Sequence, residues 1–181
     1  MTRQLMVADA CSIMNFAAVD RMGLFQAVMR GRGRWTQAVE GEIRRYASTP
    51  EFRWLSDLLD GGWLGAAIEL DRDDDRTAVE DIRMALGGIP SKPLRHLGEA
   101  ESIRAIQSRG ELAGAFFLTD DGDAAYLARH RGITVVNTRW LMTDAYSVGD
   151  LACPEPYEIL TTMRAAGRRI GLPASHIEIC P

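Results

Sequence analysis

Acidic residues at four separate places in this sequence are candidates for one shared site: Asp9, Glu42, Glu99 and Asp121. Asp9 directly follows the apolar run of residues 5–8, and Asp121 follows a second apolar run at residues 114–119. Such runs are typical of strands that are buried on both faces of a parallel sheet. Because open α/β sheets bind ligands at the carboxyl ends of their strands, we expect both aspartates to lie at that edge.

The other two acids belong to predicted helices. Glu42 stands beside the core-facing positions Val39 and Ile43, and Glu99 lies at the start of a later helix. Four carboxylates that converge without a partner repel one another, so convergence predicts a divalent cation between them. Oxygen ligands with no histidine at ligand spacing favour a hard cation, Mg²⁺ or Mn²⁺.

Each acid also has a simpler interpretation when it is taken alone. Asp9 fits a helix cap, Glu42 fits an exposed helix acid, and Glu99 fits a favourable charge at a helix N-terminus. Residues 120–123 fit a capping turn. The prediction of a metal site therefore depends on the joint pattern and on the elements that bring the acids together.

Strands and helices alternate along the chain. Hydrophobic patterns predict strands at residues 5–8, 35–36, 63–70, 114–119 and 133–136. Helical patterns cover residues 12–19, 22–30, 37–46, 50–59, 77–86, 98–109, 124–131, a segment from about 139, and 157–170. Alternating elements imply right-handed crossovers, so we expect an α/β fold: a three-layer α/β/α sandwich with a central parallel sheet. Residues 1–150 form the predicted domain, and residues 151–181 a helical extension packed on it.

Composition bounds the class of protein. A hydrophobic content of 46% and a charged content of 25% are ordinary for a soluble globular domain. No apolar run approaches the ~20 residues that span a membrane, so we expect no membrane partner and a cytoplasmic location. The net charge of −4 does not indicate a generally basic, nucleic-acid-binding surface. Arginines are grouped at positions 30/32/34, 44/45, 129/131 and 168/169; these are solvated faces by default and the only candidates for contacts to a nucleic acid.

Two further motifs are interpreted as structural. The acidic run of residues 71–75 is not a calcium loop, because its sixth position is Arg76 and its twelfth is Ile82, so we expect a solvated turn with helix-capping acids. Cysteines are odd in number and lack a CxxC spacing, which suggests neither a disulfide framework nor a zinc site. Cys11 is expected to be a small buried residue, and Asn15 to bind either substrate phosphate or a nearby backbone group.

The order of four motifs resembles the PIN-domain ribonucleases, a family that includes the toxins of bacterial toxin–antitoxin pairs. The motifs are VADACSIMNFA, AVEGEIRR, LGEAESIRAI and FFLTDDGDAAYLARHRGITVVNT, and they span residues 5 to about 138. The resemblance implies a PIN-like fold and gives Glu42 the role of the second acid. It favours Glu99 over Glu101 as the third, and its threonine–any–aspartate pattern selects Asp121, with Asp120 and Asp123 as auxiliary acids.

The resemblance implies a metal-dependent endoribonuclease. Asp9, Glu42, Glu99 and Asp121 would be its catalytic acids and, with Asp123, the ligands of Mg²⁺ or Mn²⁺. A bound cation lowers the pKa of a water molecule, which attacks a phosphodiester in line. The expected partners are an RNA substrate, an antitoxin protein and a second copy in a homodimer.

Two other functions are left open. The family usually places Thr or Ser within two residues of the first acid, but Ala10 and Cys11 stand there and Ser12 comes one residue later. This departure leaves a non-catalytic PIN-fold module that binds nucleic acid or protein. A phosphotransfer domain with Asp9 as the phospho-acceptor is disfavoured, because a second aspartate would be needed where Cys11 stands.

Overall fold

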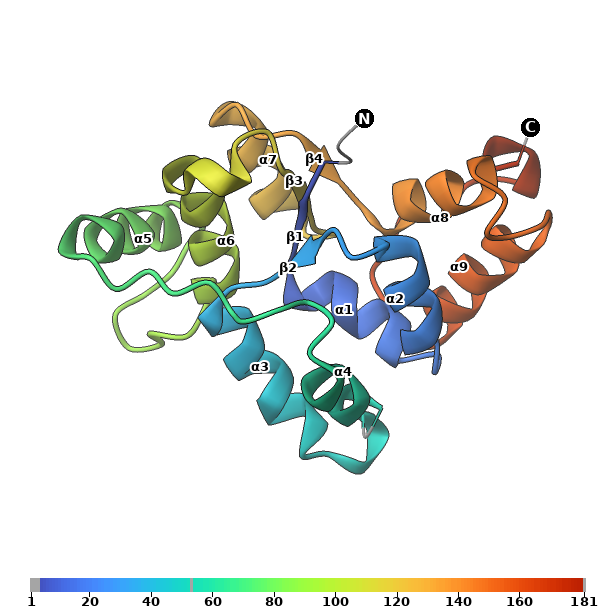
Figure 1. The fold of residues 1–181 in the computed structure, drawn as a ribbon, viewed down its shortest axis with the longest axis horizontal. Helices are drawn as coiled ribbons and strands as arrows, with labels where there is room; N and C mark the ends of the chain where they lie inside the picture. The colour runs from blue at the N-terminus through green and yellow to red at the C-terminus, as the bar shows by residue number, and fades with distance from the viewer. Residues whose placement is uncertain (1–3, 53, 181) are drawn as a thin grey trace.

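The computed structural model describes residues 4–52 and 54–180 and has a parallel sheet at its centre (Figure 1). Its strands are β1 (Met6–Ala8), β2 (Gly33–Arg34), β3 (Phe116–Leu118) and β4 (Val135–Val136). The strand order is β2-β1-β3-β4, and every pairing is parallel. Since β1 and β3 are neighbours in register, the residues that follow them emerge side by side.

The helices lie on both faces of this sheet. They are α1 (Ala10–Ala17), α2 (Met22–Met29), α3 (Gln37–Ala47), α4 (Leu55–Gly61), α5 (Asp73–Ala85), α6 (Leu97–Ser108), α7 (Gly122–His130), α8 (Thr138–Ser147) and α9 (Glu155–Ala165). Short 3₁₀ turns occupy Pro50–Phe52, Gly110–Leu112 and His176–Glu178. The chain is therefore α/β with helices around a parallel sheet, as the alternating pattern predicts.

Alternation along β1 divides the core in two. Met6 and Ala8 belong to a buried cluster with α1–α4, α8 and α9, whereas Val7 belongs to a second cluster with α5, α6 and α7. Phe117 joins Val7, and Leu118 joins Met6. A strand with apolar residues on both sides must be covered on both faces, which agrees with a three-layer arrangement.

Some predicted boundaries are wrong. No described residue of the predicted strand 63–70 belongs to a strand; its only ladder contact is an isolated bridge between Thr36 and Ile68. Gly65 has a φ of +74°, a left-handed conformation that interrupts an extended strand. β2 lies two residues before the predicted strand 35–36.

Two predicted helices also differ from the structure. The helix expected at residues 50–59 is a 3₁₀ turn followed by α4, and residue 53 between them lies outside the described residues. The last helix ends at Ala165 instead of residue 170, because the chain reaches Gly167, at φ +80°, and turns back.

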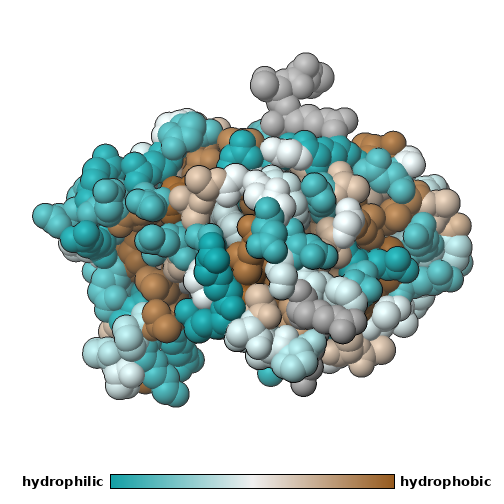
Figure 2. Space-filling model, turned by 60° about the horizontal axis from the view of Figure 1, so that its bottom comes forward, coloured by the Kyte–Doolittle hydropathy of each residue, from teal (hydrophilic) through white to brown (hydrophobic). Residues whose placement is uncertain are grey.

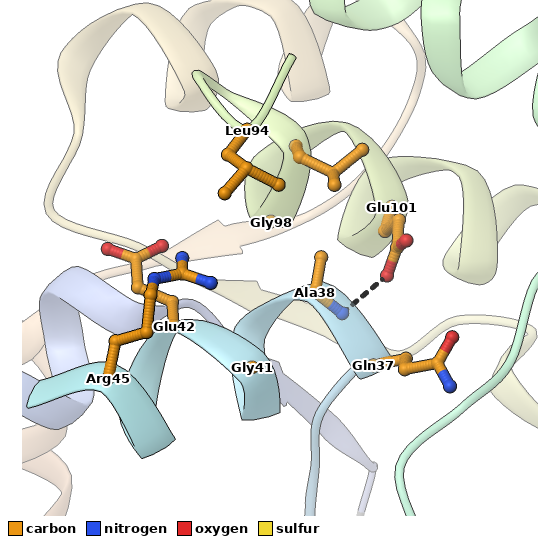
Figure 3. Close-up of a pocket in the computed structure, with 9 residues that line it drawn as sticks. Gln37, Ala38, Gly41, Glu42, Arg45, Leu94, Gly98 and Glu101 are labelled. Carbon is orange, nitrogen blue, oxygen red and sulfur yellow. Dashed lines mark hydrogen bonds between the residues drawn. The ribbon is translucent and has the colours of Figure 1, made fainter. Parts of the chain in front are cut away.

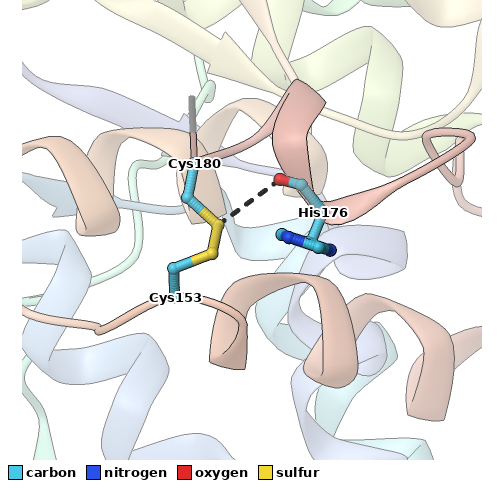
Figure 4. Close-up of a disulfide and its surroundings, with 3 residues drawn as sticks. All are labelled: Cys153, His176 and Cys180. Carbon is cyan, nitrogen blue, oxygen red and sulfur yellow. Dashed lines mark hydrogen bonds between the residues drawn. A yellow bond between two sulfur atoms is a disulfide. The ribbon is translucent and has the colours of Figure 1, made fainter.

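The C-terminal segment packs on the same core as the sheet. Ile159, Leu160, Met163 and Ile179 are buried in the cluster that contains Met6. Figure 4 shows the disulfide between Cys153 and Cys180, whose Cα atoms are 5.9 Å apart. The prediction that the cysteines form no disulfide is therefore wrong for this pair, because the fold of residues 166–180 brings back a cysteine that is 27 positions away in the sequence.

The face shown in Figure 2 carries hydrophobic residues in small groups between hydrophilic ones. It therefore presents no single large apolar patch of the kind that marks protein or membrane contacts. Within residues 4–52 and 54–180, no helix is both long enough and apolar enough to cross a membrane.

Candidate active site

Asp9 connects β1 to α1 and is 3% exposed. Its Oδ1 accepts a 2.7 Å hydrogen bond from the Ala10 backbone N–H, which fits the capping interpretation. Its Oδ2 accepts hydrogen bonds from Thr119 Oγ1 at 2.9 Å and from Cys11 Sγ at 3.0 Å. Neutral donors therefore fix the carboxylate in place, and among the described residues no cationic side chain pairs with it.

The other three predicted acids line the same pocket as Asp9. Glu42 comes from α3, Glu99 from the first turn of α6, and Asp121 from the N-cap of α7, where its Oδ1 accepts from Ala124 N at 2.8 Å. The pocket has a volume of about 210 Å³. Its lining residues are Asp9, Ala10, Cys11, Met14, Glu42, Tyr46, Glu99, Asp121 and Arg168. The structure thus brings together four carboxylates that are far apart in the sequence.

Gly98 allows α6 to approach the acids closely. A Cβ atom added there would lie 3.2 Å from Val39 Cγ2 and 3.9 Å from both Asp9 Oδ1 and Glu42 Oε2. The oxygens of two of the acids therefore face one small space beside α6, which a side chain at position 98 would narrow.

Burial of the acidic pocket and repulsion between its carboxylates raise the pKa values of two of them. Burial and the nearby Glu99 carboxylate raise the pKa of Asp9 to about 7, although the hydrogen bonds from Cys11 and Thr119 oppose the shift. Burial and Glu99 also raise the pKa of Glu42, against the opposing charge of Arg45. The raised pKa values mean that burial and the neighbouring carboxylates disfavour the charged forms of Asp9 and Glu42. A cation close to them would favour ionisation.

Protein-family models, curated proteins and solved structures were compared with the chain, and none matches it. The PIN-domain assignment therefore stays a prediction that the four sequence motifs carry.

A cation would need some rearrangement of the pocket. No group of three or more His, Cys, Asp or Glu side chains within the described ranges is arranged to hold a metal ion. Glu99 Oε1 instead lies 3.3 Å from His96 Nδ1, at the edge of the pocket. Glu42, Glu99 and Asp121 are only partly buried, whereas Asp9 is 3% exposed and is held by three hydrogen bonds.

The two auxiliary acids have different environments. Asp123 is exposed and lines no pocket shared with the four acids, so the structure does not bring it into the cluster. Asp120 accepts hydrogen bonds from Ser12 Oγ at 3.0 Å, from Asn15 Nδ2 at 2.9 Å and from the Thr138 hydroxyl. Asp120 therefore joins α1 to the start of α8. The same network corrects the interpretation of Asn15, whose amide binds side chains, not a backbone group.

Glu101 serves a different purpose from Glu99, although they are two residues apart. Its Oε2 accepts a 2.8 Å hydrogen bond from the backbone N–H of Ala38, in the first turn of α3 (Figure 3). The carboxylate satisfies a free donor of that helix end. Of the two acids, Glu99 is thus the one that lines the pocket with Asp9, as the resemblance implies.

Three residues near the site were not part of the predicted set of acids. Thr119 is the threonine of the threonine–any–aspartate motif, and its hydroxyl holds Asp9 and accepts from the Asp121 backbone N–H at 3.1 Å. Thr138 follows β4 and donates to Asp120. Arg168 lies beyond the motifs and reaches the pocket from the segment after α9; its only sequence signal is its place in an arginine pair.

Proposed function

We propose that this protein is a metal-dependent endoribonuclease of the PIN type, in which Asp9, Glu42, Glu99 and Asp121 hold Mg²⁺ or Mn²⁺. One observation carries the proposal: carboxylates from four separate segments line one pocket at the carboxyl edge of the sheet, with no cation paired to Asp9 among the described residues. Oxygen donors of this kind fit a hard divalent ion.

In this proposal the protein residues organise the site in a definite way. Thr119 and Cys11 hold Asp9 Oδ2, and Ala10 N–H holds Oδ1, so the deepest ligand is oriented before substrate binds. Glu42, Glu99 and Asp121 complete the acidic wall. When bound, the cation supplies neutralisation of phosphate charge and a water molecule of lowered pKa. No nucleophilic side chain is required for this hydrolysis.

A non-catalytic module with the same fold is the second candidate. It is favoured by Cys11, which takes the position near Asp9 where the family usually has a hydroxyl, and by the absence of a preformed group of three ligands in the described chain. A phospho-acceptor role for Asp9 is disfavoured, because both of its oxygens accept hydrogen bonds and the residue is 3% exposed.

Cleavage of a labelled single-stranded RNA separates these candidates. The wild-type protein, freed of metal with chelator, should cut the RNA only after Mg²⁺ or Mn²⁺ is added. Asp9→Asn should reduce the rate about a hundredfold or more, since even indirect partners of metal ligands contribute 10–100-fold. Asp123→Asn removes the same charge at an exposed position and is the matched control.

Two results would count against the proposal. A wild type that cuts no RNA with either metal would favour the non-catalytic module. An Asp9→Asn protein that cuts at the wild-type rate would remove the site assignment. An antitoxin partner and a homodimer stay predictions of the resemblance, and the described chain bears on neither.

A further inference from the structure

A second pocket adjoins the acidic one and differs from it in charge. It has a volume of about 340 Å³ and shares Cys11, Asp121 and Arg168 with the acidic pocket. Its lining residues are Cys11, Asn15, Asp120, Asp121, Gly122, Gly167, Arg168 and Arg169. The two pockets therefore meet at Arg168, and the second one is also lined by Arg169 of the C-terminal segment.

Arg168 is held by neutral groups. Its Nε donates to Asn15 Oδ1 at 2.9 Å, and its Nη2 is 3.4 Å from the Cys11 carbonyl oxygen. Asn15 is in turn fixed by Asp120 and by Thr138 Oγ1 at 3.0 Å. The guanidinium is thus oriented by a chain of hydrogen bonds that runs through α1 to the start of α8.

No carboxylate within the described residues forms an ion pair with Arg168, whereas most arginines in the interior of the fold are paired. Arg30 and Arg32 contact Asp144, and Arg104 contacts Asp75. Because the partners of Arg168 are an amide oxygen and a carbonyl oxygen, its full positive charge stays available to a bound anion. A planar guanidinium presents a fork of donors that matches the oxygens of a phosphate.

The second pocket contains two carboxylates, Asp120 and Asp121, but two further features of its lining favour an anion. Gly122, the first residue of α7, lines it, and the first N–H groups of a helix have no partner within that helix. Arg169 adds a second cationic side chain that is exposed to solvent. The acidic pocket repels phosphate until a cation is bound, so the adjoining pocket is the place where the chain itself supplies attraction.

We propose that Arg168 binds the phosphate next to the scissile phosphodiester of a single-stranded RNA, so that the C-terminal segment forms a substrate subsite beside the four acids. This inference rests on the proposed ribonuclease function. It gives residues 166–169 a role in binding RNA, and it makes Asn15 a positioning residue for the guanidinium.

The test compares two substrates that differ by one phosphate, a dinucleoside monophosphate and a trinucleoside diphosphate. Arg168→Gln should lower the ratio of kcat/KM for the longer substrate to that for the shorter one by roughly ten- to hundredfold, the range expected for a hydrogen bond to a charged group. Arg76→Gln, which removes an exposed arginine of α5, is the control and should leave the ratio unchanged. An unchanged ratio in Arg168→Gln would overturn the inference.

A binding measurement keeps the inference separate from the activity. In the cleavage-deficient Asp9→Asn background, the affinity for a fluorescent five-nucleotide RNA is measured by anisotropy at several concentrations of monovalent salt. Arg168→Gln should reduce the slope of log affinity against log salt by about 0.7, the value for one phosphate contact on a single strand. Arg168→Lys keeps the charge and should keep the slope.

The outcomes of the two experiments are distinguishable. If Arg168→Gln has the same salt slope as its parent and the wild type cleaves RNA normally, the subsite is overturned and the ribonuclease proposal is retained. A wild type that cuts neither substrate, together with the slope change, would overturn the ribonuclease proposal and retain Arg168 as an RNA contact. Equal weakening of both substrates, with a lowered melting temperature, would assign Arg168 a purely structural role and overturn the subsite.

Discussion

Asp9 and Asp75 are both carboxylates with almost no exposed surface, at 3% and 0%, yet their surroundings are opposite. Asp75, at the start of α5, lies 2.8 Å from Arg104 Nε and 3.0 Å from Arg72 Nε, with Arg109 at 3.8 Å. Hydrogen bonds from Arg72 and Arg104 hold its pKa below the usual value despite burial. Asp9 accepts hydrogen bonds only from neutral donors, and burial and the nearby carboxylates of Glu99 and Glu42 raise its pKa.

The comparison shows which of the two buried carboxylates has its counter-charges supplied by the protein itself. Asp75 already has its counter-charges, so it fixes α5 against α6 without any ligand. The charged form of Asp9 is disfavoured in the empty pocket, because its pKa is raised to about 7, and a cation from outside would favour it. A buried acid among arginines is thus a structural element, and a buried acid among acids is a candidate ligand. Burial alone does not distinguish a structural acid from a candidate ligand; the charges around the carboxylate do.

The largest effect that separates the two acids is on stability. Asp75→Asn should lower the free energy of unfolding by about 2 kcal/mol, because it removes the charge of a buried carboxylate that hydrogen-bonds partly exposed arginines, and the melting temperature should fall by roughly 4–8 °C. Asp9→Asn should be no less stable than the wild type in chelator at pH 8, since it relieves repulsion. Thermal melts of the three proteins measure this, and equal losses in both variants would make Asp9 a structural acid like Asp75.

Added Mn²⁺ should sharpen the contrast. A cation that binds the native site preferentially stabilises the wild type by about 2.7 kcal/mol at 100 times its dissociation constant, or several degrees in the melting temperature. Asp75→Asn should show the same shift from its lower starting point, whereas Asp9→Asn should show little. Melts in chelator and in millimolar Mn²⁺ check this. An undiminished shift in Asp9→Asn would mean that the acids do not form one metal site.

The pH dependence of stability should also distinguish the two acids. The pKa of Asp9 is raised to about 7 in the folded chain from the ordinary aspartate value of 3.8, so between these pH values the native state holds a proton that the unfolded state lacks. Stability in chelator therefore falls as pH rises, by up to about 1.4 kcal/mol per unit for one group.

Asp9→Asn should remove this contribution to the slope, and Asp75→Asn should leave it in place. For Asp75 the sign is opposite, because its lowered pKa gives stability that is lost only as pH falls through the acidic range. Urea unfolding of each protein at pH 5, 6, 7 and 8 measures the slopes. A wild-type slope that Asp9→Asn does not alter would contradict the buried, uncompensated state of Asp9.

Local patterns in the sequence were sufficient to predict the parallel sheet and the four acids of the pocket. The apolar runs before Asp9 and Asp121 identify strands β1 and β3, and parallel pairing then fixes the edge at which both acids emerge. The strand at residues 63–70 was predicted wrongly because its apolar residues reach the core through a glycine-broken loop. An apolar run shows burial, but only backbone conformation decides whether the segment extends.

Features that depend on distant contacts could not be predicted. The acidic run at residues 71–75 was expected to be solvated, yet Asp75 is fully buried because Arg104 and Arg109 of the next helical segment close over it. The disulfide joins cysteines separated by all of α9. Arg168 reaches the acids only because the chain turns back after Gly167. In each case the contact joins residues that are distant in the sequence and depends on tertiary packing, so the local spacing of residues does not predict it.

The smallest expected effect concerns Glu101, the acid that helix geometry separates from Glu99. Two residues apart on a helix correspond to about 200° of rotation, so one acid lines the pocket while the other contacts Ala38 N at the start of α3. Glu101→Gln keeps an acceptor oxygen and loses only its charge, so the free energy of unfolding should fall by about 1 kcal/mol or less. RNA cleavage should persist.

Glu99→Gln should show the reverse behaviour. Its loss removes a proposed ligand, so cleavage should fall about a hundredfold or more, while stability in chelator should not fall, because the Glu99 charge is one of the causes of the raised pKa of Asp9. Cleavage rates and melts of the two variants, prepared together, decide the matter. If Glu101→Gln lost cleavage as severely as Glu99→Gln, the assignment of Glu99 as the ligand and Glu101 as a structural acid would be wrong. The distinction between ligand acids and structural acids would then not hold for α6.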